Sequence, residues 1–181
     1  MGMTLSRPAA SALWIVLLTA ASTATTLMFA CATPFPSLAA LAAVHMHRAD
    51  GIKLMLATWL ASQIVGFGVL GYPHGLDTLG WAVALAMAAV CSAIAAYAAV
   101  DRLGERPVIA RLAAAYIVAF AAFKAVILAW AVGLGGLDTL LEPSLLQRQF
   151  LRDGAMLAGL FLLYRALVGI GLPAAREASP C

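Results

Sequence analysis

Long uncharged apolar runs, separated by short polar connections, make up most of this chain. Most of the runs approach or exceed the roughly 20 residues that an α-helix needs to cross the hydrocarbon core of a bilayer. They predict six membrane spans, at about 11–32, 37–46, 52–72, 81–100, 108–134 and 154–172. The second is too short to cross a full bilayer, so we expect it to be tilted, to sit in a thinned region or to be re-entrant.

Composition agrees with this pattern. Hydrophobic residues make up 64% of the 181 residues and charged residues only 10%, whereas about 25% of an ordinary globular domain is charged. A chain with so few charges cannot cover its own surface in water. We therefore predict an all-α integral membrane protein, built as one domain over residues 1–181. The net charge of +3 is accounted for by the inner loops described next, and it gives no indication of a nucleic-acid partner.

The distribution of basic residues orients the predicted spans, because Lys and Arg concentrate in cytoplasmic connections. With the N-terminus inside, the inner segments contain Arg7, Arg48, Lys53, Arg102, Arg106, Arg111 and Arg176. The outer connections after the first and third spans contain no Lys or Arg. Six crossings, with both termini on the cytoplasmic side of a bacterial-type inner membrane, fit this distribution best.

Two outer segments interrupt the apolar pattern. Pro34 and Pro36 flank Phe35 between the first two spans, and a broken backbone in a bilayer belongs at an interface or along a cavity. Residues 135–154 form the longest connection, and their pattern predicts a short amphipathic helix. That helix is expected either to lie on the outer leaflet or to act as a lid over an outward-facing cavity.

The outer connection GYPHGLDTLGW contains the first candidate ligand-binding side chains. His74 and Asp77 are three residues apart and have no basic neighbour in the loop, so they can bind one ligand or metal together, or simply be solvated. Tyr72 and Trp81 beside them are residue types that anchor a membrane interface whatever the protein does.

Lys124 is the most unusual residue, because it lies well inside an apolar span. A lysine in a membrane is costly and normally faces a cavity or an acid. We expect it either to contact a polar or anionic substrate group, or to form an internal ion pair or extend toward the surface. Asp77, Asp138 and Asp153 are the nearest acids on the same side.

Small residues suggest a packing face on the first span, where Ala20 and Ala24 are four apart. This spacing lets helix backbones approach closely in lipid, either within the chain or against a partner. The cysteines Cys31, Cys91 and Cys181 are scattered without a CxxC motif. Metalloprotease, hydrolase and P-loop motifs are also missing from the sequence, which favours a transporter over an enzyme and requires any energy-coupling ATPase to be another chain.

The layout resembles the S-components of energy-coupling factor (ECF) vitamin transporters. The resemblance rests on six helices with a short second one, on CATPFPSLAAL, on the hinge DRLGERPVIARL and on the long loop before DGAMLAGLFLLYRAL. It implies that outer loops close over one vitamin and that the first helix binds a coupling protein served by ATPases. The implied vitamin-binding residues are Pro34, Phe35, His74, Asp77, Trp81, Lys124 and Asp138, and the implied docking residues are Ala20 and Ala24.

In size and style the chain is similar to the solitary cobalamin-specific BtuM group, in which a cysteine thiolate binds cobalt. That similarity makes cobalamin (vitamin B12) the first expected substrate, with Cys91, Cys31 or His74 as candidate cobalt ligands and no intrinsic cofactor. Biotin, thiamine and riboflavin remain open. Two other hypotheses stand beside vitamin transport. One is a structural or assembly subunit, and the other is a membrane-embedded enzyme or metal-handling protein that uses His74, Asp77 and Lys124.

Overall fold

The computed structural model describes residues 7–29 and 33–175, and every regular element within these ranges is helical. The predicted all-α class is therefore confirmed. In chain order the elements are α1 (Arg7–Phe29), α2 (Phe35–His45), α3 (Arg48–Gln63), the π-helical turn η1 (Ile64–Val69), α4 (Leu76–Leu103), α5 (Val108–Leu134), α6 (Leu137–Leu140) and α7 (Pro143–Gly169).

Length and composition support a membrane protein. Three segments are long and apolar enough to cross a bilayer, namely Arg48–Val69, Leu76–Leu103 and Val108–Leu134. The apolar part of α1 and the whole of α2 are shorter. The number of crossings and the side of each terminus stay predictions.

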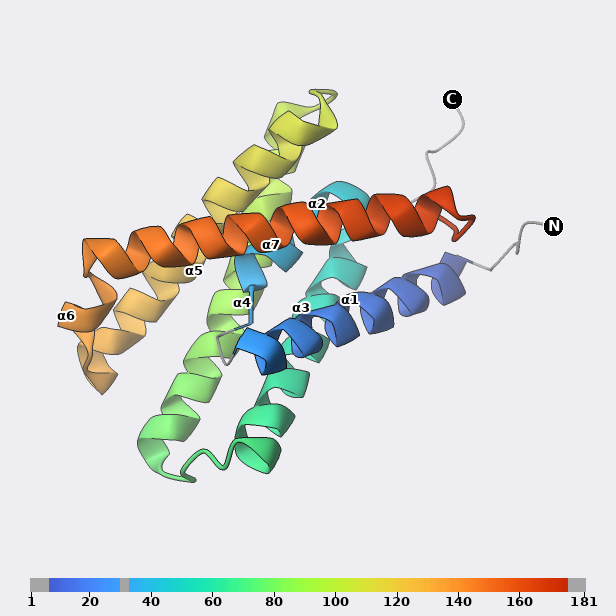
Figure 1. Cartoon of the computed structure of the whole chain (residues 1–181). Helices are drawn as coiled ribbons and strands as arrows, with labels where there is room; N and C mark the ends of the chain where they lie inside the picture. The colour runs from blue at the N-terminus through green and yellow to red at the C-terminus, as the bar shows by residue number, and fades with distance from the viewer. Residues whose placement is uncertain (1–6, 30–32, 176–181) are drawn as a thin grey trace.

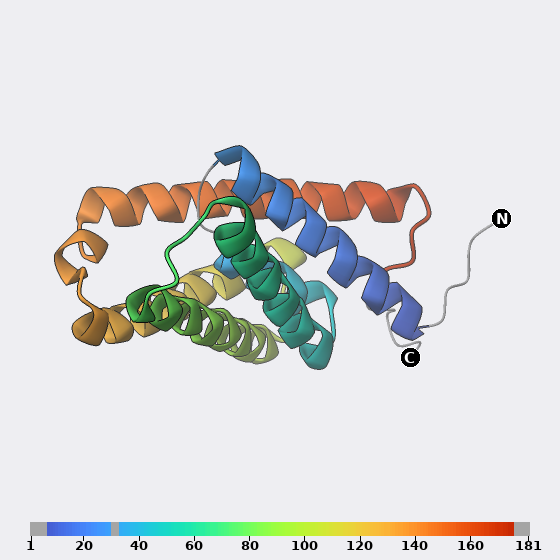
Figure 2. The ribbon, with the colours of Figure 1, turned by 90° about the horizontal axis from the view of Figure 1, so that it is seen from below.

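The short second span is explained by its position at the centre of the molecule. Every residue from Phe35 to Val44 is buried, as expected for a helix that is hydrophobic all round. In Figures 1 and 2, α7 passes on one side of α2 and the α4–α5 pair lies on the other. Because protein surrounds α2, its length need not match the thickness of a bilayer.

The helices alternate in direction, which gives the molecule two functional ends. At the first end, Ser11 donates a hydrogen bond of 2.8 Å to Asp50, and Trp14 donates one of 2.8 Å to the carbonyl of Pro173. The start of α1, the α2–α3 corner and the end of α7 thus meet at what we call the corner end. The opposite end carries residues 70–75 and α6, and we call it the loop end (Figure 1).

One predicted element is wrong. The segment 135–154 was expected to contain a short amphipathic helix separate from the last span, but α7 runs without a break from Pro143 to Gly169. Proline is well accepted in the first turn of a helix, and the only later glycine before 159, Gly154, packs against the ring of Tyr116. With no strong helix breaker between them, the two predicted pieces form one helix.

Candidate functional site

The regular geometry of α3 ends at the loop end in the π-helical turn η1. The amide of Leu70 donates to the carbonyl of Val65 at 2.9 Å, five residues earlier. The sequence IVGFGV favours such a departure, because glycines and β-branched residues are both weaker helix formers than leucine or alanine. Turns of this type occur frequently at functional sites.

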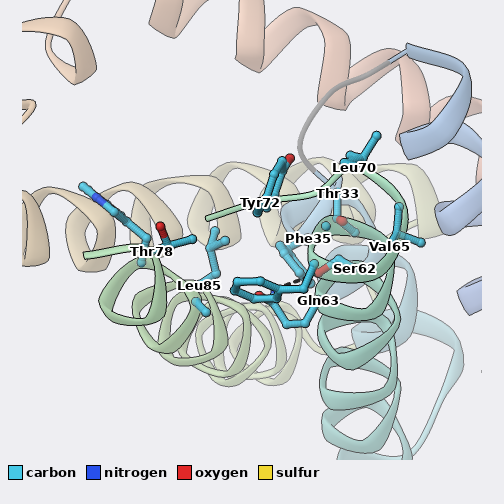
Figure 3. A pocket seen from close by; sticks show the side chains of 13 residues that line it. Thr33, Phe35, Ser62, Gln63, Val65, Leu70, Tyr72, Thr78 and Leu85 are labelled. Atoms are coloured by element: carbon cyan, nitrogen blue, oxygen red, sulfur yellow. Dashed lines mark hydrogen bonds between the residues drawn. The ribbon is translucent and has the colours of Figure 1, made fainter. Parts of the chain in front are cut away.

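A pocket of about 220 Å³ lies beside this turn, between α3, η1, α4 and the start of α2 (Figure 3). Aromatic and aliphatic side chains form most of its wall. The lining residues are Thr33, Phe35, Ser62, Gln63, Val65, Gly66, Phe67, Leu70, Tyr72, Thr78, Trp81, Ala82 and Leu85. None of these residues is ionisable at neutral pH, so the pocket suits an uncharged, largely apolar or aromatic group.

A small polar strip runs along the α3 side of the pocket. Ser62 donates a hydrogen bond of 2.7 Å to the carbonyl of Trp59, and the amide nitrogen of Gln63 donates one of 3.1 Å to Ser62 (Figure 3). The indole nitrogen of Trp59 donates a hydrogen bond of 2.8 Å to the carbonyl of Ala82, and this bond joins α3 to α4 beside the pocket. Apolar walls with a few fixed polar groups are typical of small-molecule sites, in which the polar groups set orientation.

The volume of the pocket limits what it encloses. Drug-sized ligands occupy pockets of about 300–1,000 Å³, so a space of about 220 Å³ holds only a small molecule or part of a larger one. A corrin is far larger than this space. Residues 70–75 at the pocket border are all exposed. This border is held by the backbone hydrogen bond of 3.0 Å from Tyr72 to the carbonyl of Gly66 and by the contacts of the Tyr72 and His74 rings with Phe67.

The pocket includes only some of the residues predicted from the sequence. Phe35 and Trp81 line it, and Pro34 is buried directly before α2. His74 is exposed, with its ring 5.4 Å from that of Phe67. The remaining two acids, Asp77 in the first turn of α4 and Asp138 in α6, are exposed and do not line the pocket.

Lys124 belongs to a different site, between α5 and α7. Its side chain is 9% exposed, and its ammonium group donates a hydrogen bond to the amide oxygen of Gln149. Asp153, one helical turn further along α7, is also buried and acts electrostatically on Lys124. The carboxylate of Asp153 forms an ion pair of 3.3 Å with the guanidinium group of Arg152. We call Lys124, Gln149, Arg152 and Asp153 the α5–α7 polar cluster.

Two further hydrogen bonds join this cluster to the rest of the fold. The hydroxyl of Ser37 on α2 donates to the carbonyl of Asp153 at 2.5 Å, and that of Tyr116 on α5 donates to the carbonyl of Phe150 at 2.5 Å. The cluster is thus an internal contact of α7 with its neighbours, which matches the structural interpretation of Lys124. Gln149 was missed by the sequence reasoning, although its spacing of four from Asp153 was visible in the sequence.

The candidate metal ligands do not meet. Cys91 is a half-buried free thiol on α4. It lies about 120° around the helix from Leu85 and about 180° from Ala82, at about 100° per residue, and so it is not on the pocket-lining face. Cys31 lies outside the described residues, as does Cys181. Among the residues that the structure describes, no three His, Cys, Asp or Glu side chains are arranged to hold a metal ion.

The predicted docking residues lie on the outside of the molecule. Ala20 and Ala24 are exposed on α1, in line with Ala12 and Val16 at the same spacing of four. The opposite face of α1 is buried through Trp14, and through Leu18 one turn later. Within residues 7–29 and 33–175, this face of mostly small side chains along α1 is exposed.

Comparison with protein-family models, with curated proteins and with solved structures finds no match to this chain.

Proposed function

We propose that this chain is a membrane-embedded binding protein for vitamin uptake, and that the pocket beside η1 is its ligand site. The observation that carries the proposal is the coincidence of a π-helical turn, an uncharged aromatic pocket and an exposed border loop at one end of the molecule. A ligand is captured there by aromatic contact, and its orientation is set by a few amide and hydroxyl groups.

Individual residues have distinct roles in this proposal. Phe35 forms the floor of the pocket, and Trp81 and Tyr72 supply flat apolar walls for a heterocyclic ring. Gln63 and Thr78 provide the hydrogen bonds that distinguish one ring from another. The lining contains no charged side chain, which favours a neutral ring system over an anion.

The resemblance to ECF S-components makes cobalamin the first substrate to test. Its binding requires residues 70–75 to move outward, because the present space of about 220 Å³ does not enclose a corrin. In that open form His74, on the moving loop, is a better candidate for the cobalt ligand than Cys91. Biotin, thiamine and part of riboflavin are the smaller alternatives, and they require less opening.

The proposal includes six crossings with both termini on the cytoplasmic side of a bacterial-type inner membrane. The loop end then faces outward, as vitamin capture requires. Two features support this orientation. Four arginines lie near the corner end, in or next to the connections between helices, namely Arg48, Arg102, Arg106 and Arg111. The loop between η1 and α4 has no Lys or Arg.

A coupling protein with ATPases is the proposed partner, and it binds the exposed small face of α1 through Ala20 and Ala24. Close approach of small residues is a common way for helices to associate in lipid. The same face also supports the assembly-subunit hypothesis. The transport hypothesis and the assembly-subunit hypothesis differ in vitamin binding, which only the transport hypothesis requires.

The test is equilibrium binding of a panel of vitamins to the purified chain in detergent or nanodiscs. We expect one vitamin to bind the wild type, and Gln63→Ala to weaken its binding by about tenfold, the usual effect of removing one oriented hydrogen bond. Gln147→Ala is the control, because Gln147 is exposed on α7 away from the pocket. If no vitamin binds, or if both variants have equal effects, the pocket is not the site.

A further inference from the structure

Side chains from three helices form a basic and aromatic cluster at the corner end. His45, the last residue of α2, packs its ring 4.3 Å from the ring of Tyr164 and 5.9 Å from that of Phe161, both on α7. Arg111 in the first turn of α5 and Arg165 on α7 are close enough for their positive charges to act on the His45 ring. We call His45, Arg111 and Arg165 the corner basic site.

The described carboxylates form no ion pair with the arginines of this cluster. In the part of the chain that the structure describes, the ion pairs within 4.0 Å are Lys53 with Asp50 and Arg152 with Asp153. Asp50, at the start of α3, also accepts a hydrogen bond from Ser11. Within these ranges, therefore, no carboxylate lies within ion-pairing distance of Arg111 or Arg165.

Two nitrogen atoms of the site are buried without a hydrogen-bond partner in the described protein. They are Nε of Arg111 and Nε2 of His45. The guanidinium Nε always carries a hydrogen, and so it can only donate. A buried donor without an acceptor is destabilising, and such a group commonly marks a bound ion or water.

We propose that the corner basic site binds a phosphate group, belonging either to an anionic phospholipid headgroup or to a soluble phosphate. Phosphate oxygens supply the acceptor that Nε of Arg111 lacks, and guanidinium groups match phosphate geometry through paired hydrogen bonds. Basic sites between membrane helices on the cytoplasmic side are a recognised place for lipid headgroups. The ring of Phe161 provides an apolar wall beside the charges. This site is independent of the vitamin pocket at the loop end.

Native mass spectrometry of the detergent-purified full chain tests the proposal. Phosphatidylglycerol and phosphatidylcholine are added in parallel, and inorganic phosphate is then titrated in. We expect the wild type to retain phosphatidylglycerol in preference to phosphatidylcholine. Arg111→Gln and Arg165→Gln should each lower that retention by about tenfold or more, because each removes a charged hydrogen bond. Arg165 is exposed, so its variant is expected to fold even if Arg111→Gln does not.

Arg106→Gln is the matched control, since Arg106 is exposed in the α4–α5 connection near the same end. Retention unchanged in this control supports a defined site. Displacement of the lipid by inorganic phosphate also supports it, and identifies the phosphate group alone as sufficient. The proposal is overturned if Arg106→Gln lowers retention as much as Arg165→Gln, since attraction would then be a general effect of surface charge. Equal retention of both lipids by the wild type, together with no bound inorganic phosphate in the titration, overturns it as well.

Discussion

The ammonium group of Lys124 on α5 donates a hydrogen bond to the amide oxygen of Gln149 on α7. This contact satisfies a buried cation in an otherwise apolar helix and joins two long helices whose backbones have little other contact. It also explains why the charge is tolerated in a membrane helix, because the cation faces another helix and the nearby Asp153.

Replacing Gln149 should destabilise the protein more than replacing Lys124. Gln149→Leu leaves a buried ammonium group without its acceptor, and we expect a loss of about 1–3 kcal/mol in the free energy of unfolding. Lys124→Met removes the charge together with its need for a partner, so its cost should be smaller. Denaturant unfolding in detergent, monitored by the circular-dichroism signal of the helices, measures the free energy of unfolding of both variants.

The double variant Lys124→Met/Gln149→Leu gives the decisive comparison for this pair. It should be more stable than Gln149→Leu alone, because no unpaired cation is left. Gln147→Leu, on the exposed side of α7, should have almost no effect. Additive losses in the double variant would show that the hydrogen bond does not stabilise the fold.

Two glycines in the same π-helical turn should respond differently to alanine. A Cβ on Gly66 would lie 2.8 Å from the ring of Tyr72, whereas one on Gly68 would meet nothing within 4 Å. Gly66→Ala should therefore displace Tyr72 from the pocket border and change ligand affinity severalfold. Gly68→Ala should leave affinity unchanged. Equal affinities for the two variants, measured by equilibrium binding, would remove Tyr72 from the site.

Tyr97 of α4 should be important for the α2–α3 corner. Its hydroxyl lies 3.0 Å from the carbonyls of Ala42 and His47, and so it joins α4 to the corner between α2 and α3. Tyr97→Phe should cost about 0.5–1.5 kcal/mol of stability, the usual net contribution of one hydrogen bond. Gly51→Ala should also destabilise, because its Cβ would meet the Tyr97 ring and hydroxyl.

A double-mutant cycle checks that the two changes act on one contact. If they do, Gly51→Ala costs less in the Tyr97→Phe background than in the wild type, since the hydroxyl has already gone. Thermal unfolding in detergent is a sufficient readout. A cost of Gly51→Ala that is the same in both backgrounds would show that the clash does not involve the hydroxyl.

Removing the Cys91 thiol should not affect binding at the pocket. The thiol lies well around α4 from the pocket-lining residues Ala82 and Leu85. If cobalamin binds, its absorption bands should therefore be the same in wild type and Cys91→Ala, and should shift in His74→Ala if histidine binds the cobalt. Bands that change only in Cys91→Ala would require a rearranged α4 and would contradict the site described here.

Much of the fold follows from hydrophobic pattern alone. The bounds predicted for the span at 108–134 coincide with α5, because Pro107 and Gly135 limit a continuous run of good helix formers. The length of α7 was not predictable in the same way. Its first half is polar and its second half apolar, so hydropathy separates two pieces that have the same backbone conformation.

The site was less predictable than the fold. Phe35 and Trp81 were implied by the resemblance to S-components, whereas Ser62 and Gln63 lie in the middle of the predicted span 52–72 and carry no motif. Their participation depends on the π-helical turn, which sequence periodicity does not reveal. Likewise, the partner of Lys124 was sought among acids, since pairing of charges is the common solution, and its hydrogen-bond partner is an amide.

Cysteine protection at Thr78 shows whether the pocket beside η1 opens outward and holds a vitamin, as we propose. Thr78→Cys is introduced into a chain whose native cysteines are replaced, and intact cells are treated with a membrane-impermeant maleimide. We expect labelling from outside the cell, and protection from labelling by one vitamin at saturating concentration. Labelling only after the membrane is permeabilised, or labelling that no vitamin reduces, would contradict it.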